Sequence, residues 1–169
     1  MELHIFPAGE QDLPAISRLM ETAALDPQHP GWFCWDGPEF LRRHLAEEGF
    51  LLKAVADHAV AGFLMVRFPG RQEDNLGFDL GLSPGERDQV AHMESVVVLP
   101  RYRGHGIQKT LLRAAEDILA PLPYRRYLAT VHPQNLPSLR SFQALGYEIL
   151  RTTVKYGGLS RHIVGKIKF

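Results

Sequence analysis

Residues 100–112, PRYRGHGIQKTLL, combine glycines with basic side chains at a point where a strand is expected to give way to a helix. The N-terminus of a helix exposes four backbone N–H groups without intrahelical partners and carries partial positive charge. Because Gly104 and Gly106 have no side chains, a phosphate group could approach these N–H groups directly, with Arg103 and His105 adding positive charge. The same spacing also fits a simple tight turn, so the glycines alone leave both interpretations open.

Two other phosphate-binding motifs fit this stretch poorly. A P-loop requires Gly-Lys-Ser/Thr after four intervening residues, and no such run is present. A dinucleotide-binding turn would place a third glycine three positions after Gly106, where Lys109 stands. An antiparallel hairpin expected over residues 50–68 also argues against an alternating βαβ array at the start of the chain.

Hydrophobic periodicity and turn residues predict the elements that position this glycine turn. Strands are expected at 3–5, on both sides of Asp57-His58 within 49–70, and at 92–99, 127–131, 147–155 and 162–168. Helices are expected from Asp12 to Ala24, at 39–48, at 107–119, and from Asn135 or Ser138 to Gly146. Segments 26–38 and 71–89 are expected to be loops. This order favours an α/β fold with a mixed, mostly antiparallel central sheet and helices on its faces.

The composition predicts one domain, residues 1–169, with no exceptional partner. Hydrophobic residues make up 45% and charged residues 22% of the chain, as in ordinary globular proteins. Nineteen basic residues balance 19 acidic ones, so no overall field favours nucleic acid or a membrane. A single cysteine, Cys34, excludes an intrachain disulfide and a cysteine-rich metal site, and no metal is expected. With no signal-peptide pattern and no long apolar run, we expect a cytoplasmic protein.

Two segments together resemble the GCN5-related N-acetyltransferase (GNAT) superfamily. Residues 96–107 follow the pattern V-x-V-x-P-x-x-R-G-x-G-I, and their core, residues 101–106, matches Gln/Arg-x-x-Gly-x-Gly/Ala of the acetyl-CoA signature. The second family element matches Asn135-x-x-Ser138, then Phe142, then Leu145-Gly146-Tyr147. The order of elements also matches, so the resemblance covers nearly the whole chain.

The resemblance implies an acyl-CoA N-acyltransferase fold whose sheet splays between strands 92–99 and 127–131 to admit the pantetheine arm of acetyl-CoA. Backbone groups of Val96 and Val98 would bind that arm, and one of their N–H groups would stabilise the oxyanion. Many relatives have glycine or alanine where Gln108 stands. The acetyl-CoA contacts implied by the resemblance are Val96, Val98, Arg103, Gly104, His105, Gly106, Ile107, Gln108, Asn135, Ser138 and Phe142.

Transfer to an amine requires a base, because an ammonium ion must lose a proton before it can attack. Glu94 is the first candidate base, since strand alternation would place it on the same face as His92 and Val96, and His92 is the second. Many family members carry a tyrosine that protonates the leaving thiolate at the position of Phe142, which has no proton to give. Tyr156 is the first substitute for that acid, and unassisted departure of the thiolate is the alternative.

Three segments are expected to shape the acceptor site: 31–37, the charged insertion 71–89, and 156–160 together with Arg161. The insertion has a net charge of −3 and either attracts a cationic amine or forms a solvated face. The aromatic residues of the first segment either wall the acceptor site or form a small core; they are Trp32, Phe33 and Trp35.

The expected function is therefore acetyl transfer from acetyl-CoA to a primary amine by direct attack in a ternary complex, with a small-molecule acceptor favoured. Three alternatives stay open: a non-catalytic acyl-CoA-binding domain, an N-acetyltransferase acting on a peptide or protein amine, and a nucleotide-binding protein that uses the same turn. The sequence also leaves open whether the protein is a homodimer.

Overall fold

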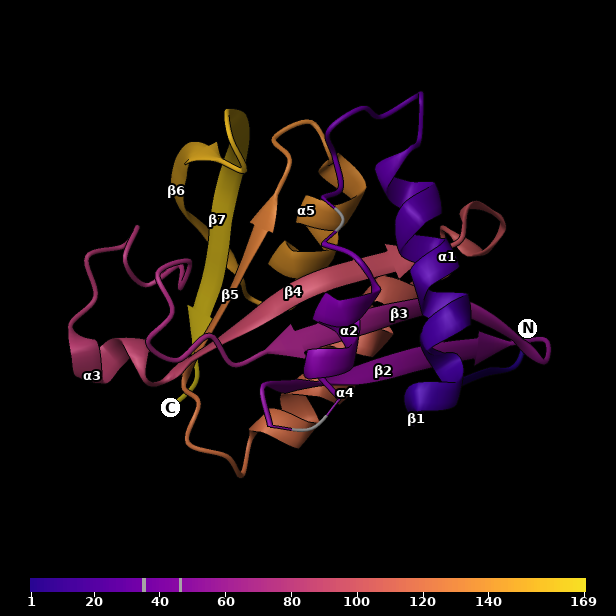
Figure 1. Ribbon diagram of the computed structural model, residues 1–169, viewed down its shortest axis with the longest axis horizontal. Coiled ribbons are helices and arrows are strands. Elements are labelled where there is room, and N and C mark those ends of the chain that lie inside the picture. The colour runs from indigo at the N-terminus through magenta and orange to yellow at the C-terminus, as the bar shows by residue number, and fades with distance from the viewer. Residues whose placement is uncertain (35, 46) are drawn as a thin grey trace.

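A computed structural model describes residues 1–34, 36–45 and 47–169 (Figure 1). Its strands form a single sheet in the order β1-β2-β3-β4-β5-β7-β6, and the pairing of β4 with β5 is parallel while the other pairings in the described chain are antiparallel. The mixed, mostly antiparallel sheet is as predicted. The strands are β1 (Leu3–Pro7), β2 (Gly49–Ala56), β3 (Ala59–Arg67), β4 (Val90–Val98), β5 (Arg126–Val131), β6 (Glu148–Lys155) and β7 (Leu159–Ile167).

Helices cover both faces of the sheet, and each face has its own core. One core joins α1 and α2 to β3, and these two helices lie in front of the sheet in Figure 1. The larger core joins α4 and α5 to the opposite face. No helix in the described part of the chain is long and apolar enough to cross a bilayer. The helices are α1 (Leu13–Ala24), α2 (Pro38–Arg43), α3 (Pro84–Arg87), α4 (Ile107–Leu119) and α5 (Leu136–Ala144).

The parallel strands β4 and β5 separate after a short stretch of pairing. Val90 to His92 pair with Arg126 to Leu128, and beyond these residues each strand continues without pairing to the other. Figure 1 shows β4 and β5 running apart from this point. The splay predicted between the two strands is thus confirmed. It leaves one edge of β4 unpaired at Val96, where the acetyl-CoA signature begins.

A β-bulge lies at Glu94, in the middle of β4. Met65 of β3 pairs with Ser95, whereas the next residue, Val66, pairs with Met93. Glu94 is therefore an extra residue without a partner on β3. A bulge bends its strand and redirects a side chain, and bulges are common beside active sites.

Because of the bulge, the alternation expected along β4 is wrong between His92 and Val96. Val96 and Val98 pack toward the core of α4 and α5, while Val97 packs in the core of α1 and α2. His92 faces the insertion instead, where its ring accepts a hydrogen bond from Leu76. His92 and Val96 consequently lie on opposite faces, because the extra residue between them reverses the alternation.

The second helix is shorter than predicted, ending at Arg43 rather than at residue 48. The carbonyl oxygen of Glu48 accepts a hydrogen bond from the Phe68 amide at 2.7 Å, so this end of the segment is drawn into the β2–β3 ladder. Segment 71–89 is mostly irregular, as expected, although it contains the single turn of α3. The remaining predicted boundaries agree with the structure within a few residues, and the helix at 107–119 agrees at both ends.

Candidate acetyl-transfer site

The glycine turn, residues 100–107, joins β4 to α4 and is open to solvent. Gly104 and Gly106 have φ angles of 81° and 74°, values that disfavour residues with a side chain. A Cβ atom added to Gly104 would meet no atom within 4 Å, so there is room in front of this part of the turn. Tyr102, which is buried, fixes the turn to the core from below.

Consecutive amides of this turn have no acceptor in the protein. Within the described chain, the amides from Gly104 to Lys109 donate no hydrogen bond to another residue. Arg103 differs from them, because its amide donates to the carbonyl oxygen of Pro100 at 3.2 Å. A run of free N–H groups at the start of a 13-residue helix can bind an anion such as a pyrophosphate.

The backbone of β4 offers further hydrogen-bonding groups at the splay. The Leu99 amide donates to the Ala61 carbonyl oxygen at 2.8 Å. Because alternate residues of an antiparallel strand bond to the same neighbour, Val96 and Val98 direct their backbone groups away from β3, toward the opening. The Val98 carbonyl oxygen accepts a hydrogen bond from Nε of Arg103 at 3.2 Å.

The second motif lies beside this opening at the start of α5. Asn135 caps the helix, its Oδ1 accepting a hydrogen bond from the Ser138 amide at 3.3 Å. The Gln108 side chain donates to Oγ of Ser138 at 2.9 Å, so it links α4 to α5 instead of crowding the glycine turn. Phe142 is buried and packs edge-on against Tyr147, with ring centroids 5.1 Å apart.

Two cavities meet at the splay. The smaller one, about 80 Å³, is bordered by Val96 and by the residues of the second motif. The larger one, about 270 Å³, extends under the insertion 71–89. The residues that line both cavities are Asp36, Met93, Glu94, Thr130 and Tyr156.

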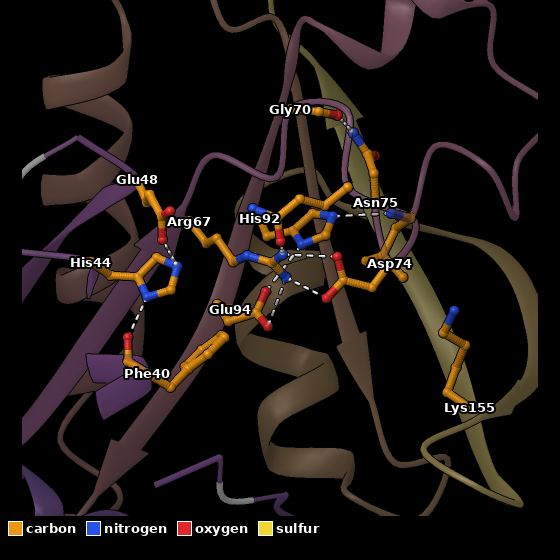
Figure 2. A network of polar contacts seen from close by, with 12 residues as sticks. Phe40, His44, Glu48, Arg67, Gly70, Asp74, Asn75, His92, Glu94 and Lys155 are labelled. Atoms are coloured by element: carbon orange, nitrogen blue, oxygen red, sulfur yellow. Dashed lines mark hydrogen bonds and ion pairs between the residues drawn. The ribbon is translucent and has the colours of Figure 1, made fainter. Parts of the chain in front are cut away.

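Glu94 is held by a chain of hydrogen bonds that begins in the insertion (Figure 2). The Leu76 amide donates to Nε2 of His92 at 3.1 Å, which places the imidazole proton on Nδ1. Nδ1 then donates to Oε2 of Glu94 at 3.0 Å. The lone pair of His92 is therefore already engaged, so this geometry suits His92 to orienting Glu94 rather than to removing a proton itself.

Arg67, which pattern analysis did not single out, also contacts this carboxylate. Its guanidinium is 3% exposed and lies 3.7 Å from Oε1 of Glu94. Asp74 accepts two hydrogen bonds from the same guanidinium, at 2.7 and 2.8 Å. Burial by itself would raise the pKa of Glu94, but the hydrogen bond from His92 and the charge of Arg67 hold that pKa below its usual range.

Asp36 is a second carboxylate at the junction of the cavities, and no sequence motif singled it out. Although Asp36 is exposed, partial desolvation by neighbouring atoms and the charge of Glu94 raise its pKa above the usual range. An ammonium group placed between Asp36 and Glu94 would relieve their mutual repulsion.

Tyr156 enters the junction from the turn between β6 and β7. Its φ angle of 50° is uncommon for an aromatic residue, and its hydroxyl forms a 2.8 Å hydrogen bond with Oγ1 of Thr130. Although half of its surface is exposed, desolvation of the hydroxyl raises the pKa of Tyr156 to about 12. The phenol consequently stays protonated and can donate a hydrogen bond.

The acidic residues of the insertion mainly fasten it to the scaffold. Asp74 binds Arg67, and Asp79 pairs with Lys155 at 2.9 Å. Glu86 pairs with Arg126 at 3.3 Å, so much of the negative charge of the insertion is already neutralised. Among the described residues, no group of three or more His, Cys, Asp and Glu side chains could hold a metal ion.

Two aromatic residues that follow Gly31 lie at the smaller cavity. Trp32 and Phe33 both line that cavity, and Phe33 also packs against the core of α1 and α2. Phe33 thus takes part in the core, and a role of these aromatic residues in an acceptor site stays a prediction. Trp35, the third of them, lies outside the described residues.

The splay between β4 and β5 and the free amides of the glycine turn are the features expected from the resemblance to the GNAT superfamily. The acetyltransferase (GNAT) family model matches residues 16–147, so the chain belongs to this family. No curated protein matches the sequence significantly.

Solved structures of acetyltransferases share the fold at low sequence identity. A Salmonella typhimurium acetyltransferase, yncA, with its cofactor acetyl-CoA, superposes with a TM-score of 0.76 at 20% identity, over 99% of this chain and 94% of that chain. Arabidopsis thaliana NAA60 in complex with acetyl-CoA gives 0.75 at 15% identity, over 98% of each chain. The ribosomal-protein-S18-alanine N-acetyltransferase of Escherichia coli gives 0.70 at 16% identity, over 99% and 96%.

Proposed function

We propose that this protein transfers the acetyl group of acetyl-CoA to a primary amine by direct attack in a ternary complex, and that the acceptor is a small molecule. The observation that carries the proposal is the succession of Glu94, the open β4 edge and the free amides along one strand and the turn that follows it. The pyrophosphate would bind the amides from Gly104 to Lys109. The pantetheine arm would follow Val98 and Val96 into the splay, beside Asn135 and Ser138, as an added strand would.

The thioester would then lie near Val96, with Glu94 across the cavity. Glu94 is ionised at neutral pH because its pKa is lowered, so it can bind the acceptor's ammonium group and pass a proton to water. His92 and Arg67 keep the carboxylate in place. The neutral amine attacks the thioester carbonyl carbon, and the backbone N–H of Val96 or Val98 stabilises the oxyanion.

Collapse of the tetrahedral intermediate breaks the C–S bond as the N–C bond is kept. The nitrogen loses a second proton, and the CoA thiolate either takes up one proton or leaves as the anion. Phe142 cannot supply this proton. The phenol of Tyr156 lines the cavity, which supports a role for it in donating a hydrogen bond to the departing sulfur. Because its pKa of about 12 exceeds that of a thiol, it stabilises the thiolate more readily than it protonates it.

The size of the larger cavity supports a small acceptor. A volume of about 270 Å³ is just below the range of pockets that hold drug-sized ligands. The insertion closes over this cavity through the Asp74–Arg67 and Asp79–Lys155 pairs. A peptide would need a longer open groove, so a protein amine is the less favoured acceptor.

The test is CoA release measured with a panel of small amines and short peptides, beside calorimetric binding of acetyl-CoA, ATP and NAD. We expect binding of acetyl-CoA and turnover with at least one small amine. Binding without turnover would instead favour a non-catalytic acyl-CoA-binding domain. Binding of ATP or NAD in place of acetyl-CoA would refute the proposal, and turnover with peptides alone would refute the small acceptor.

A further inference from the structure

Arg161, at the start of β7, is a buried cation at the wall of the smaller cavity. The residue is 2% exposed, and its guanidinium donates to the carbonyl oxygens of Ser160, at 2.9 Å, and of Gly31. The thiol sulfur of Cys34 lies 3.9 Å away. Within the part of the chain that the structure describes, no carboxylate lies within 4.0 Å of this guanidinium.

Arg67, a second buried arginine beside the cavities, has the carboxylate partners that Arg161 lacks in the described chain. Arg67 is 3% exposed and has two carboxylates around it, with Asp74 bound in bidentate fashion and Glu94 close by. Burying a charge is costly unless a group of opposite sign accompanies it, and neutral carbonyl oxygens compensate only in part. Arg161 therefore gains most from an anion that enters the cavity from outside.

Arg161 itself supplies positive charge at its end of the cavity. His132, which also lines this cavity, has its pKa lowered by burial and then by the charges of Arg161 and His162. At the junction with the larger cavity the sign is opposite, since Asp36 and Glu94 lie there. One cavity thus has a cationic end and an anionic end.

Arg161 lies on the acceptor side of the sheet rather than beside the glycine turn. Side chains alternate along a strand, so Arg161 shares a face of β7 with Ile163. Ile163 packs against Leu76 of the insertion, whereas the next residue, Val164, packs in the core of α4 and α5. This placement assigns Arg161 to the acceptor and not to the phosphates of the donor.

We propose that Arg161 binds the carboxylate of an acceptor of the amino-acid class, whose ammonium group points toward Glu94 and Asp36. A guanidinium and a carboxylate form two parallel hydrogen bonds, which fix orientation as well as charge. Tyr156 lies between the two ends, with its ring centroid 5.4 Å from the Arg161 guanidinium. The inference rests on the proposed N-acetyltransferase function and specifies its acceptor.

The experiment compares amino acids with the amines that remain when their carboxylate is removed: leucine with isoamylamine, and phenylalanine with phenethylamine. We expect the wild-type protein to have a kcat/KM for the amino acid about 10- to 100-fold above that for the matching amine. Arg161→Gln should remove this preference, mainly by raising KM for the amino acid, and should leave the kcat/KM for the amine within about 3-fold. Arg161→Lys should restore part of the preference because it keeps the charge.

Arg125→Gln is the matched control, because Arg125 also donates to two backbone carbonyl oxygens, those of Leu122 and Tyr124, but does not line either cavity. It should leave the preference intact. Equal losses for both members of a pair in Arg161→Gln, or a wild-type protein that prefers the amine, would overturn the proposal.

A binding measurement separates this inference from the proposed function. In the presence of CoA, calorimetry should detect N-acetyl-leucine binding to the wild-type protein and about 10- to 100-fold weaker binding to Arg161→Gln. Such binding without turnover of any amine would uphold the carboxylate site and refute the acetyltransferase function. Turnover of amines with no effect of Arg161→Gln on N-acetyl-leucine binding would uphold the acetyltransferase function and refute the carboxylate site.

Discussion

The donor half and the proposed acceptor half of the cleft are formed by different kinds of chemical groups. The donor half consists of backbone: consecutive amides of the glycine turn and the free edge of β4. The proposed acceptor half consists of side chains from β3, β4, β5 and β7, from the turn between β6 and β7, from residues 32–34 and 36, and from the segment 71–89. A glycine turn followed by a helix is enough to present backbone groups to a ligand. The positions of these side chains depend instead on packing between segments that are distant in the sequence. A substitution that disables one half should therefore leave ligand binding by the other half intact.

Gly104→Glu should disable the donor half alone. The new carboxylate would occupy the space in front of the free amides, and like charges brought together cost several kcal/mol, so acetyl-CoA affinity should fall by about 1,000-fold. Calorimetry measures this directly. Gly81→Glu is the control, since Gly81 also has a positive φ of 67° and open space around a Cβ atom. Unchanged acetyl-CoA affinity in Gly104→Glu would remove the glycine turn from the donor site.

Glu94→Gln should disable the chemistry while leaving the donor half intact. Turnover at neutral pH should fall by about 100-fold with acetyl-CoA affinity unchanged, because loss of a general base typically costs this much. The loss should shrink at alkaline pH, where the acceptor amine is already neutral. A pH–rate profile of the variant parallel to that of the wild-type protein would show that Glu94 is not the general base.

The lowered pKa of Glu94 also predicts how stability depends on pH. A carboxyl group whose pKa is lower in the folded state stabilises the fold above its unfolded pKa, and this contribution is lost as pH falls through the folded pKa. The melting temperature of Glu94→Gln should consequently fall less steeply below pH 4.5, the usual value for glutamate, than that of the wild-type protein. Equal slopes would indicate that the carboxylate is not held by His92 and Arg67.

Tyr156→Phe tests the boundary between the two halves. Removing one hydrogen-bond donor from the departing thiolate should slow turnover by about 5-fold and leave acetyl-CoA affinity unchanged. Because the pKa of Tyr156 is raised to about 12, the wild-type pH–rate profile should show no loss of activity from tyrosine ionisation near pH 10, the ordinary value. Wild-type kinetics in the variant would leave the thiolate to depart unassisted.

Gln108→Ala should have the smallest effect, confined to the donor half. It removes the hydrogen bond to Ser138 that links α4 to α5, which should lower the free energy of unfolding by about 1 kcal/mol. Acetyl-CoA affinity should change by less than about 3-fold, because the amide of Gln108 stays in place. Gln143→Ala, at an exposed position on α5, serves as the control. A large loss of affinity would mean that the side chain itself contacts the donor.

The donor half could be predicted from sequence because its signals are local. Helical spacing of Ile107, Leu111, Leu112 and Leu119 placed α4 at its observed ends, and all four are buried. The glycines just before that helix marked where free amides would face solvent. The splay of β4 from β5 was expected from the family resemblance.

The acceptor half could not be predicted in the same way, because its geometry depends on contacts between distant residues. The bulge at Glu94 exists only through the register of β4 against Met65 and Val66, which no local pattern encodes. Arg67 closes an apolar strand, and this position was a signal that its charge would be buried and need a partner. Its partner, Asp74, belongs to a loop whose path the sequence does not specify.

A crystal structure with bound acetyl-CoA would test the proposed site directly. We expect pyrophosphate oxygens on the amides from Gly104 to Lys109, the pantetheine arm along Val96 and Val98, and the thioester facing Glu94. Acetyl-CoA bound elsewhere, or a thioester on the face of the sheet away from Glu94, would contradict it.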